Sequence, residues 1–254
     1  MRLPLLRSVF LLAGWLAPCV VGAQALLGSD CSALTQLSGQ QQTIALSRPA
    51  AINQWIVVSV AVNNTFAQFD ATSPVTDSAS NSYPVYDAVA MAGGSGVLAT
   101  FAGRATKALK AGDTITIAYT TTGSASAQAC ATATSFPGVL LLSDPSDATG
   151  EASGSGTALS VTASTTTQYP SELIYSAFAS TSTPGAMNAL APAQGLVQTC
   201  SVDTTVCVVP AWNLGATSSG ISEGADASSA NSVAWGALLL TFQSNDRIFA
   251  NGFE

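Results

Sequence analysis

Histidine is missing from all 254 residues, and charged residues make up only 8% of the chain. The lack of imidazole excludes Ser–His–Asp and Cys–His catalysis and the metal sites that need histidine ligands. Ala, Ser, Thr and Gly must therefore cover the surface. That composition disfavours solvent-exposed helices, which depend on Glu, Lys and Arg for their polar face, and it favours β-strands joined by turns.

Basic residues are scarce, since seven Lys and Arg stand against fourteen Asp and Glu. Without Arg2 and Arg7 of the N-terminal segment the net charge is near −9. The sequence contains no basic patch, so we expect neither nucleic acid nor an anionic membrane surface as a partner. The longest later apolar run, 233–242, is about half of the roughly 20 residues that span a bilayer, and we expect no transmembrane helix.

The first 25 residues have the order of a signal peptide. Arg2 and Arg7 precede an apolar run over 9–21, and small residues end it at Ala23 and Ala25. This pattern predicts a signal peptide over 1–25, cut before Leu26. The alternatives are a membrane anchor, for which the run is too short, and a lipid anchor on Cys19, which the preceding proline disfavours. The expected location is secreted, periplasmic or at the cell surface.

Four cysteines follow the predicted cleavage site: Cys31, Cys130, Cys200 and Cys207. An even number in an exported chain indicates two disulfides, for which three pairings are possible. Cys200 with Cys207 would staple a hairpin, and Cys31 with Cys130 would tie the N-terminal segment to the middle of the fold. Without C-x-x-C or histidine, the four do not have the spacing of a zinc site.

Alternating apolar and polar residues predict antiparallel strands. The clearest are 55–62, 113–119, 172–178 and 233–242. Further candidates are 43–47, 83–91, 96–103, 128–136, 158–163 and the arms of the Cys200–Cys207 turn. Many short strands separated by turns predict an all-β, antiparallel β-sandwich, jelly-roll-like or immunoglobulin-like, with about 8–11 strands.

The remaining segments complete the expected organisation. Polar loops are predicted over 144–156 and 213–231, and one helical turn over 107–111. No charged or Pro-rich linker divides the chain, so we expect a single domain over 26–243, followed by a C-terminal tail over 244–254.

Three stretches resemble a family of exported bacterial β-sandwich domains of mostly unassigned function. They are V-T-D-S-A-S-N-S-Y from Val75 to Tyr83, A-G-D-T-I-T from Ala111 to Thr116, and E-L-I-Y from Glu172 to Tyr175. The family has glycine where this chain has Ser80, which suggests a differently built turn before Asn81. The resemblance implies a jelly-roll-like or immunoglobulin-like sandwich over about 44–242 and transfers no catalytic residue.

The C-terminal sequence D-R-I-F-A-N-G-F-E is similar to tails that end various exported proteins of Gram-negative bacteria. Two interpretations are open. It is a recognition or sorting tag, or a frayed end after the last strand. Ile248, Phe249 and Phe253 make it more apolar than a free tail needs.

Oxygen-bearing side chains offer two kinds of chemistry. Carboxylate pairs suffice for glycoside hydrolysis, and Glu172 and Glu223 are the isolated candidates. Ca²⁺ takes oxygen ligands from loops. Two stretches offer them, and their candidate ligands are Asp77, Asn81, Asp87, Asp144, Asp147 and Glu151. Neither stretch has the EF-hand spacing, and Asx residues at turns usually bond the backbone, which is the interpretation favoured here.

Trp212, beside the predicted hairpin and in a loop context, is a candidate for stacking on a sugar ring, or else a core residue that covers the hairpin. We expect a non-enzymatic binding module for a glycan or another surface component. The alternatives are a structural or assembly protein of the cell envelope and a polysaccharide-acting hydrolase or lyase on a jelly roll. Saturable sugar binding, tail-dependent oligomers and carboxylate-dependent turnover distinguish the three.

Overall fold

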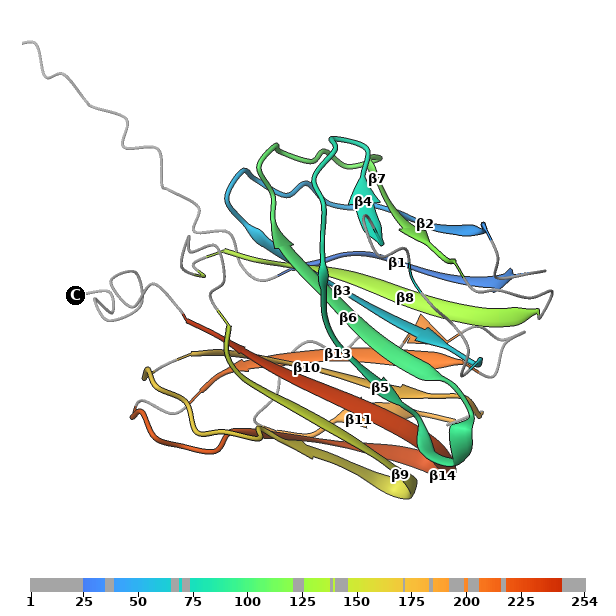
Figure 1. Ribbon diagram of the computed structural model, residues 1–254, viewed down its shortest axis with the longest axis vertical. Coiled ribbons are helices and arrows are strands. Elements are labelled where there is room, and N and C mark those ends of the chain that lie inside the picture. The colour runs from blue at the N-terminus through green and yellow to red at the C-terminus, as the bar shows by residue number, and fades with distance from the viewer. Residues whose placement is uncertain are drawn as a thin grey trace, which may run out of the picture.

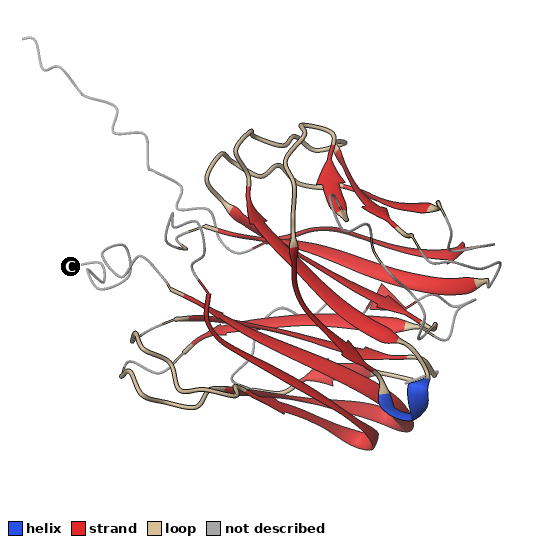
Figure 2. Cartoon of the chain, in the orientation of Figure 1, coloured by secondary structure: helices blue, strands red, loops and turns tan. Residues whose placement is uncertain are grey.

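The computed structural model is nearly all β, with antiparallel sheets packed in several layers (Figures 1 and 2). The residues that the structure describes are 25–34, 39–64, 69, 74–120, 126–137, 139, 146–170, 172–182, 185–191, 199–200, 206–215 and 218–243. This part holds fourteen strands and one short 3-10 helix, η1 (Ala92–Gly94). The expected signal peptide up to residue 24, and the tail from 244, lie outside the described residues.

Two sheets form the N-terminal half, which is blue to green in Figure 1. The smaller one has the order β2 (Gln41–Ala45), β7 (Thr114–Ala118), β4 (Val75–Asp77). The larger one has the order β1 (Ala25–Leu34), β8 (Ala127–Phe136), β3 (Trp55–Val62), β6 (Val97–Arg104), β5 (Val85–Ala90). All their pairings are antiparallel, as the alternating sequence predicts.

Strand β3 shows how the sequence sets this packing. Its even-numbered residues, such as Ile56 and Val58, join the core against the three-stranded sheet. Trp55 and Val57 point the other way, into a second core. All eight residues of β3 are buried, because a sheet covers each face of the strand. The alternation within 55–62 therefore predicted both the strand and its two faces.

The C-terminal half is one six-stranded sheet. Its strands are β11 (Met187–Ala189), β14 (Gly224–Phe242), β10 (Leu173–Ser180), β13 (Cys207–Leu214), β12 (Thr199–Cys200) and β9 (Ser146–Thr162), which pairs with β14. A straight strand of 17 residues extends over about 56 Å. The N–H of Ser164 nevertheless donates to the carbonyl of Thr149 at 2.8 Å. The β9–β14 ribbon must therefore fold back on itself, as Figure 1 shows in the lower half of the view.

The folding back of the β9–β14 ribbon creates a third apolar core. In the second half of β14, Leu238 and Leu240 face the five-stranded sheet. Ala237 and Leu239 face the opposite way, toward Val161 on the returning half of β9. Alternate residues of β10 divide between the same two cores. The molecule is thus a stack of four β-layers with three apolar cores between them, and the four-layer stack is consistent with an antiparallel sandwich.

Two expected loops and one expected helical turn are wrong. Residues from Ser146 of the loop predicted over 144–156 belong to β9, and the end of the loop predicted over 213–231 belongs to β14. Both stretches carry small polar residues on an exposed ribbon face, a pattern that looks like loop composition. Over 107–111 there is no helix, since Leu109 forms an antiparallel bridge with Ala50.

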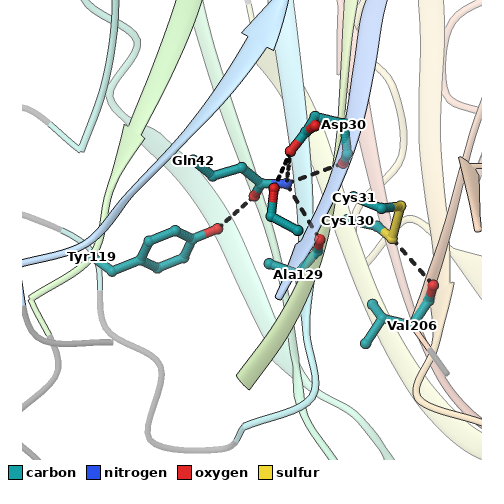
Figure 3. Close-up of a disulfide and its surroundings, with 8 residues drawn as sticks. Asp30, Cys31, Gln42, Tyr119, Ala129, Cys130 and Val206 are labelled. Carbon is teal, nitrogen blue, oxygen red and sulfur yellow. Dashed lines mark hydrogen bonds between the residues drawn. A yellow bond between two sulfur atoms is a disulfide. The ribbon is translucent and has the colours of Figure 1, made fainter. Parts of the chain in front are cut away.

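The predicted disulfide between Cys31 and Cys130 is present and joins directly opposite residues of β1 and β8 (Figure 3). Cys130 Sγ lies 3.2 Å from the carbonyl oxygen of Val206, so the bridge packs beneath the start of β13. Cys207 is also disulfide-bonded, and Cys200 is its backbone partner in the β12–β13 ladder. The bridge between β1 and β8 ties the N-terminal strand to the centre of the five-stranded sheet.

A polar cluster covers the other side of the disulfide strands (Figure 3). Gln42 Nε2 donates to the Asp30 carboxylate and to the Asp30 carbonyl, both at 3.0 Å. The Tyr119 hydroxyl donates to Gln42 Oε1 at 2.8 Å. Burial, and then the negative charge of Asp30, raises the pKa of Tyr119, which keeps the phenol a donor. The cluster joins three strands, β1, β2 and the end of β7.

Candidate functional site

Asp77, predicted as a calcium ligand, is instead the acceptor of a closed hydrogen-bond cluster. The backbone N–H groups of Ala79 and Asn81 donate to its Oδ1, both at 2.9 Å. Asn81 Nδ2 at 2.7 Å and the Tyr83 hydroxyl donate to its Oδ2. Burial, and then the bond to Asp77, raises the pKa of Tyr83 and keeps it protonated. Four donors occupy this carboxylate, so it has no free lone pair for a cation.

Asn81 carries the cluster across to a neighbouring loop. Its Oδ1 accepts from Thr106 N–H at 2.9 Å, Thr106 Oγ1 at 2.8 Å and Lys107 N–H at 2.9 Å. Its Nδ2 also donates to the Lys107 carbonyl at 3.1 Å. The predicted turn role of the Asx residues therefore describes their contacts better than the calcium role.

Ser80 closes this turn in a left-handed conformation, with φ at 67°. This is the conformation that glycine adopts without cost. Serine thus occupies a backbone geometry that favours glycine, and the comparison of this turn with that of the resembling family stays a prediction. The N–H of Ser80 donates to the Asp77 carbonyl at 2.9 Å.

The other predicted ligands do not gather around Asp77. Asp87 lies in β5, where its carboxylate accepts from the adjacent Ala88 N–H. Asp144 lies outside the described residues, and Glu151 is exposed on β9. Within the described ranges, no three His, Cys, Asp or Glu side chains group closely enough to hold a metal ion. The calcium hypothesis thus has no assembled site among these residues.

Trp212 does not lie in a loop, because it belongs to β13, opposite Tyr175 of β10. Its ring is partly buried and packs edge-on against Phe136, with centroids 5.7 Å apart. This placement matches the alternative interpretation of Trp212 as a core residue. A more exposed aromatic side chain, which could stack on a sugar ring, lies elsewhere in the molecule.

Tyr169 is that aromatic residue. It is 45% exposed, the most exposed of the described aromatic side chains. It follows Gln168 on the loop between β9 and β10, and the loop is pinned to its neighbour by Thr167, whose N–H donates to the Ile221 carbonyl at 2.9 Å. Ile221 is itself 39% exposed. Two hydrogen-bonded loops therefore each expose a large apolar side chain at one corner of the folded sheet.

Carboxylates surround this surface. Asp147, at the start of β9, accepts a hydrogen bond from the Gln168 N–H. Glu172 accepts one from the Tyr169 N–H at 3.3 Å. Both acids therefore hold the turn that carries the tyrosine. We call the group Asp147, Gln168, Tyr169, Glu172, Ile221 and Glu223 the Tyr169 corner.

Glu223 approaches from the second loop. Gly215 N–H donates to the Glu172 carbonyl at 2.7 Å, and a Cβ placed on Gly215 would lie 2.9 Å from Glu223 Oε1. The Glu223 side chain thus lies against the backbone just after β13. Three acids that the sequence assigned to different roles converge here: Asp147 to calcium, Glu172 and Glu223 to hydrolysis.

Glu172 is the most perturbed acid of the corner. Only 1% of its surface is exposed, and burial raises its pKa to about 7, with Asp147 contributing further. Near neutral pH it therefore holds a proton for part of the time. Asp147 and Glu223 are partly exposed. The corner can offer an aromatic face beside hydrogen-bond acceptors.

Tyr169 was not among the residues expected from the sequence, although its surroundings in the chain could have indicated it. Tyr169 is an aromatic residue in the polar stretch T-T-T-Q-Y-P-S, where no strand alternation would bury it. The convergence of the three acids had no sequence signal, because it depends on the folding back of β9 and on the contact between two loops far apart in the chain.

No protein-family model matches the chain, and no curated protein is similar to it. The likeness to exported sandwich domains stays a resemblance carried by three short motifs. Among the described residues, no helix is long and apolar enough to cross a bilayer.

Proposed function

We propose that this protein is an exported, non-enzymatic binding module that recognises a glycan through the Tyr169 corner. The observation that carries the proposal is the exposed Tyr169 ring flanked by partly exposed carboxylates on two hydrogen-bonded loops. The C–H face of a sugar ring packs on an aromatic face, and carboxylate oxygens accept hydrogen bonds from sugar hydroxyls.

The anchoring of the corner supports binding. A surface whose loops are already held by hydrogen bonds loses little conformational freedom when a ligand docks. Thr167 is held through both its N–H and its hydroxyl, which donate to the Ile221 carbonyl. Gly220 N–H in turn donates to the Thr167 carbonyl at 2.6 Å. The backbone beside Tyr169 is therefore held in place before a ligand docks.

The burial of Glu172 distinguishes this corner from the active site of a hydrolase. Glycoside hydrolysis needs one protonated and one ionised carboxyl group flanking the scissile bond. Glu172 has the pKa of a general acid, yet it is buried beneath the turn that it supports. A substrate oxygen has no hydrogen-bonding access to it, so binding without turnover fits the corner better.

Envelope assembly is the second candidate, and one observation favours it. Among the described strands, β9 pairs with β14 alone, so no described strand lies along its other edge. Such an edge can accept a strand from another chain. Light scattering of the purified protein would separate the two candidates, because assembly predicts oligomers and glycan recognition predicts binding by the monomer.

The test is a pull-down of the disulfide-bonded chain from Leu26 onward against insoluble polysaccharides and soluble glycans, with and without calcium. We expect saturable binding to at least one glycan, unchanged by calcium. Tyr169→Ala should abolish it and Tyr169→Phe, which keeps the ring, should retain it. Binding lost on Trp212→Ala but kept on Tyr169→Ala would contradict the assignment, provided that both variants unfold at the wild-type temperature.

A further inference from the structure

All four basic residues of the described chain lie in or directly beside two neighbouring loops. Arg48 belongs to the loop over 46–54. Arg104 is the last residue of β6, and Lys107 and Lys110 belong to the loop that follows it, up to residue 113. Arg48, Lys107 and Lys110 are exposed, and Arg104 is partly exposed. The sequence shows no basic patch, and none was expected. The fold nevertheless assembles one from two segments that lie more than 50 residues apart in the chain.

Backbone hydrogen bonds join the two loops along their length. The N–H of Ala50 and the N–H of Leu109 each donate to the carbonyl of the other residue, at 3.0 and 2.8 Å. Asn53 N–H donates to the Ala105 carbonyl at 2.8 Å, and Gly112 N–H donates to the Leu46 carbonyl at 2.8 Å. These bonds run from Leu46 and Gly112 at one end to Asn53 and Ala105 at the other, so the nine residues 46–54 are held against the second loop along its length. The cations are therefore spread along a held pair of loops, a form suited to a polymer.

The Asp77–Asn81 cluster fixes the centre of this pair of loops. Asn81 Oδ1 accepts from the backbone of both Thr106 and Lys107, and Asp77 in turn anchors Asn81. The motif that resembles exported sandwich domains thus positions one of the four cations. The Asx residues act on this surface by positioning Lys107.

The charge of this end contrasts with the rest of the molecule. Asp113 is the one acid within the two loops, where its carboxylate accepts the Lys110 N–H at 2.7 Å. The C-terminal half of the described chain contains acids and no Lys or Arg. An approaching polyanion is therefore attracted to the loop pair and repelled elsewhere.

We infer that the loop pair 46–54 and 104–113 binds an anionic polysaccharide. This inference is independent of the Tyr169 corner, which lies in the other half of the molecule (Figure 1). The disulfide between Cys31 and Cys130 indicates an oxidising compartment outside the cytosol. The anionic polymers met there are polysaccharides with carboxylate, sulfate or phosphate groups, so nucleic acid is the less suitable partner.

The experiment measures binding of the disulfide-bonded chain to polygalacturonate as the carboxylate probe, heparin as the sulfate probe and dextran as the neutral probe. We expect saturable binding to an anionic probe and none to dextran. With three or four contacts, the logarithm of the binding constant should fall with the logarithm of salt concentration with a slope of about −2 to −3, by analogy with single-stranded polyanions. Arg48→Gln, Lys107→Gln and Lys110→Gln together should reduce affinity at low salt about tenfold or more.

A charge-matched variant controls for net charge. Thr157→Glu, Ser160→Glu and Asn188→Glu also lower the charge by three, on exposed positions of the folded ribbon, and should bind nearly as the wild type does. Tyr169→Ala should leave polyanion binding intact, so this inference and the glycan proposal fail separately. Equal losses in both triple variants, binding to neither anionic probe, or tighter binding to a DNA duplex than to either polysaccharide would overturn the inference.

Discussion

The phenol oxygen of Tyr175 lies 2.8 Å from Oγ of Ser59, and this contact joins β10 of the folded sheet to β3 of the five-stranded sheet. Both residues are buried, and Ser59 Oγ also lies 3.3 Å from Thr100 Oγ1. Burial raises the pKa of Tyr175, so the hydroxyl stays protonated. A polar contact thus aligns two sheets that otherwise meet through apolar side chains.

Removal of this contact should cost stability. We expect Tyr175→Phe to lower the free energy of unfolding by about 1–2 kcal/mol, because Ser59 loses one buried partner while the ring keeps its packing. Urea unfolding of Tyr175→Phe, Ser59→Ala and the double variant measures the coupling between the two hydroxyls. Strictly additive losses would show that the contact does not hold the sheets together.

Ser80 is a position where glycine should be better. Its φ of 67° costs a residue with a Cβ about 1 kcal/mol, and glycine avoids most of that cost. We expect Ser80→Gly to raise the free energy of unfolding by about 0.5 kcal/mol, after the greater flexibility of glycine in the unfolded chain is subtracted. Thermal unfolding measures it. Ala79→Gly, at a neighbour without a positive φ, is the matched control and should destabilise; stabilisation by both changes would contradict this explanation.

The Cys31–Cys130 disulfide and the predicted Cys200–Cys207 disulfide should differ in their effect on stability. Cys31 and Cys130 enclose a sequence separation of 99 residues. On the chain-entropy argument their loss costs up to about 5 kcal/mol, against roughly 2.5 kcal/mol for a loop the size of Cys200–Cys207. Paired Cys→Ala variants, compared by denaturant unfolding, check the order. Mass spectrometry of non-reduced peptides checks the pairing, and a Cys31–Cys200 peptide would contradict it.

Glu172 should make the protein less stable as pH rises from about 4.5 to 7. Its pKa is about 7 in the folded protein against an ordinary value of 4.5. The native state therefore binds more protons than the unfolded state in that window, and stability falls by an amount on the order of 1–3 kcal/mol. Stability is fully retained below pH 4.5, and the loss is complete above pH 7.

Urea unfolding across this pH range measures the effect. Glu172→Gln, which mimics the protonated acid, should flatten the curve, and Asp147→Asn should lower the pKa of Glu172 and shift the loss to lower pH. Glu223 is the other acid near this turn, and Glu223→Gln is the control for a general effect of charge. A Glu172→Gln curve parallel to that of the wild type would contradict the assignment.

The fold was predictable wherever one residue in two is large and apolar. Strand β3 and the second half of β14 follow directly from that alternation. The folded ribbon of β9 and β14 was not predictable, because its outer positions carry Ser, Gly and Thr, and this composition resembles that of a loop. Val161 and Ala225 supply the inward alternation there, but they are too few to outweigh the polar residues between them.

The candidate sites were predictable only in part. The sequence supplied Asp147 as a candidate calcium ligand and Glu172 and Glu223 as isolated acids, but the meeting of the three depends on contacts between loops. The basic loop pair depends on the same kind of contact, between Ala50 and Leu109 and their neighbours. Residue type limits what a side chain can do, whereas tertiary packing decides which side chains act together.

Amide chemical-shift mapping tests the central claim most directly, using the glycan that the pull-down selects as the tightest ligand. Binding at the Tyr169 corner predicts shifts at Gln168, Tyr169 and the segment 221–223, and their loss in Tyr169→Ala. Shifts centred on β13 near Trp212 or along the edge of β9 opposite β14, or no saturable glycan binding by the folded protein, would contradict the account.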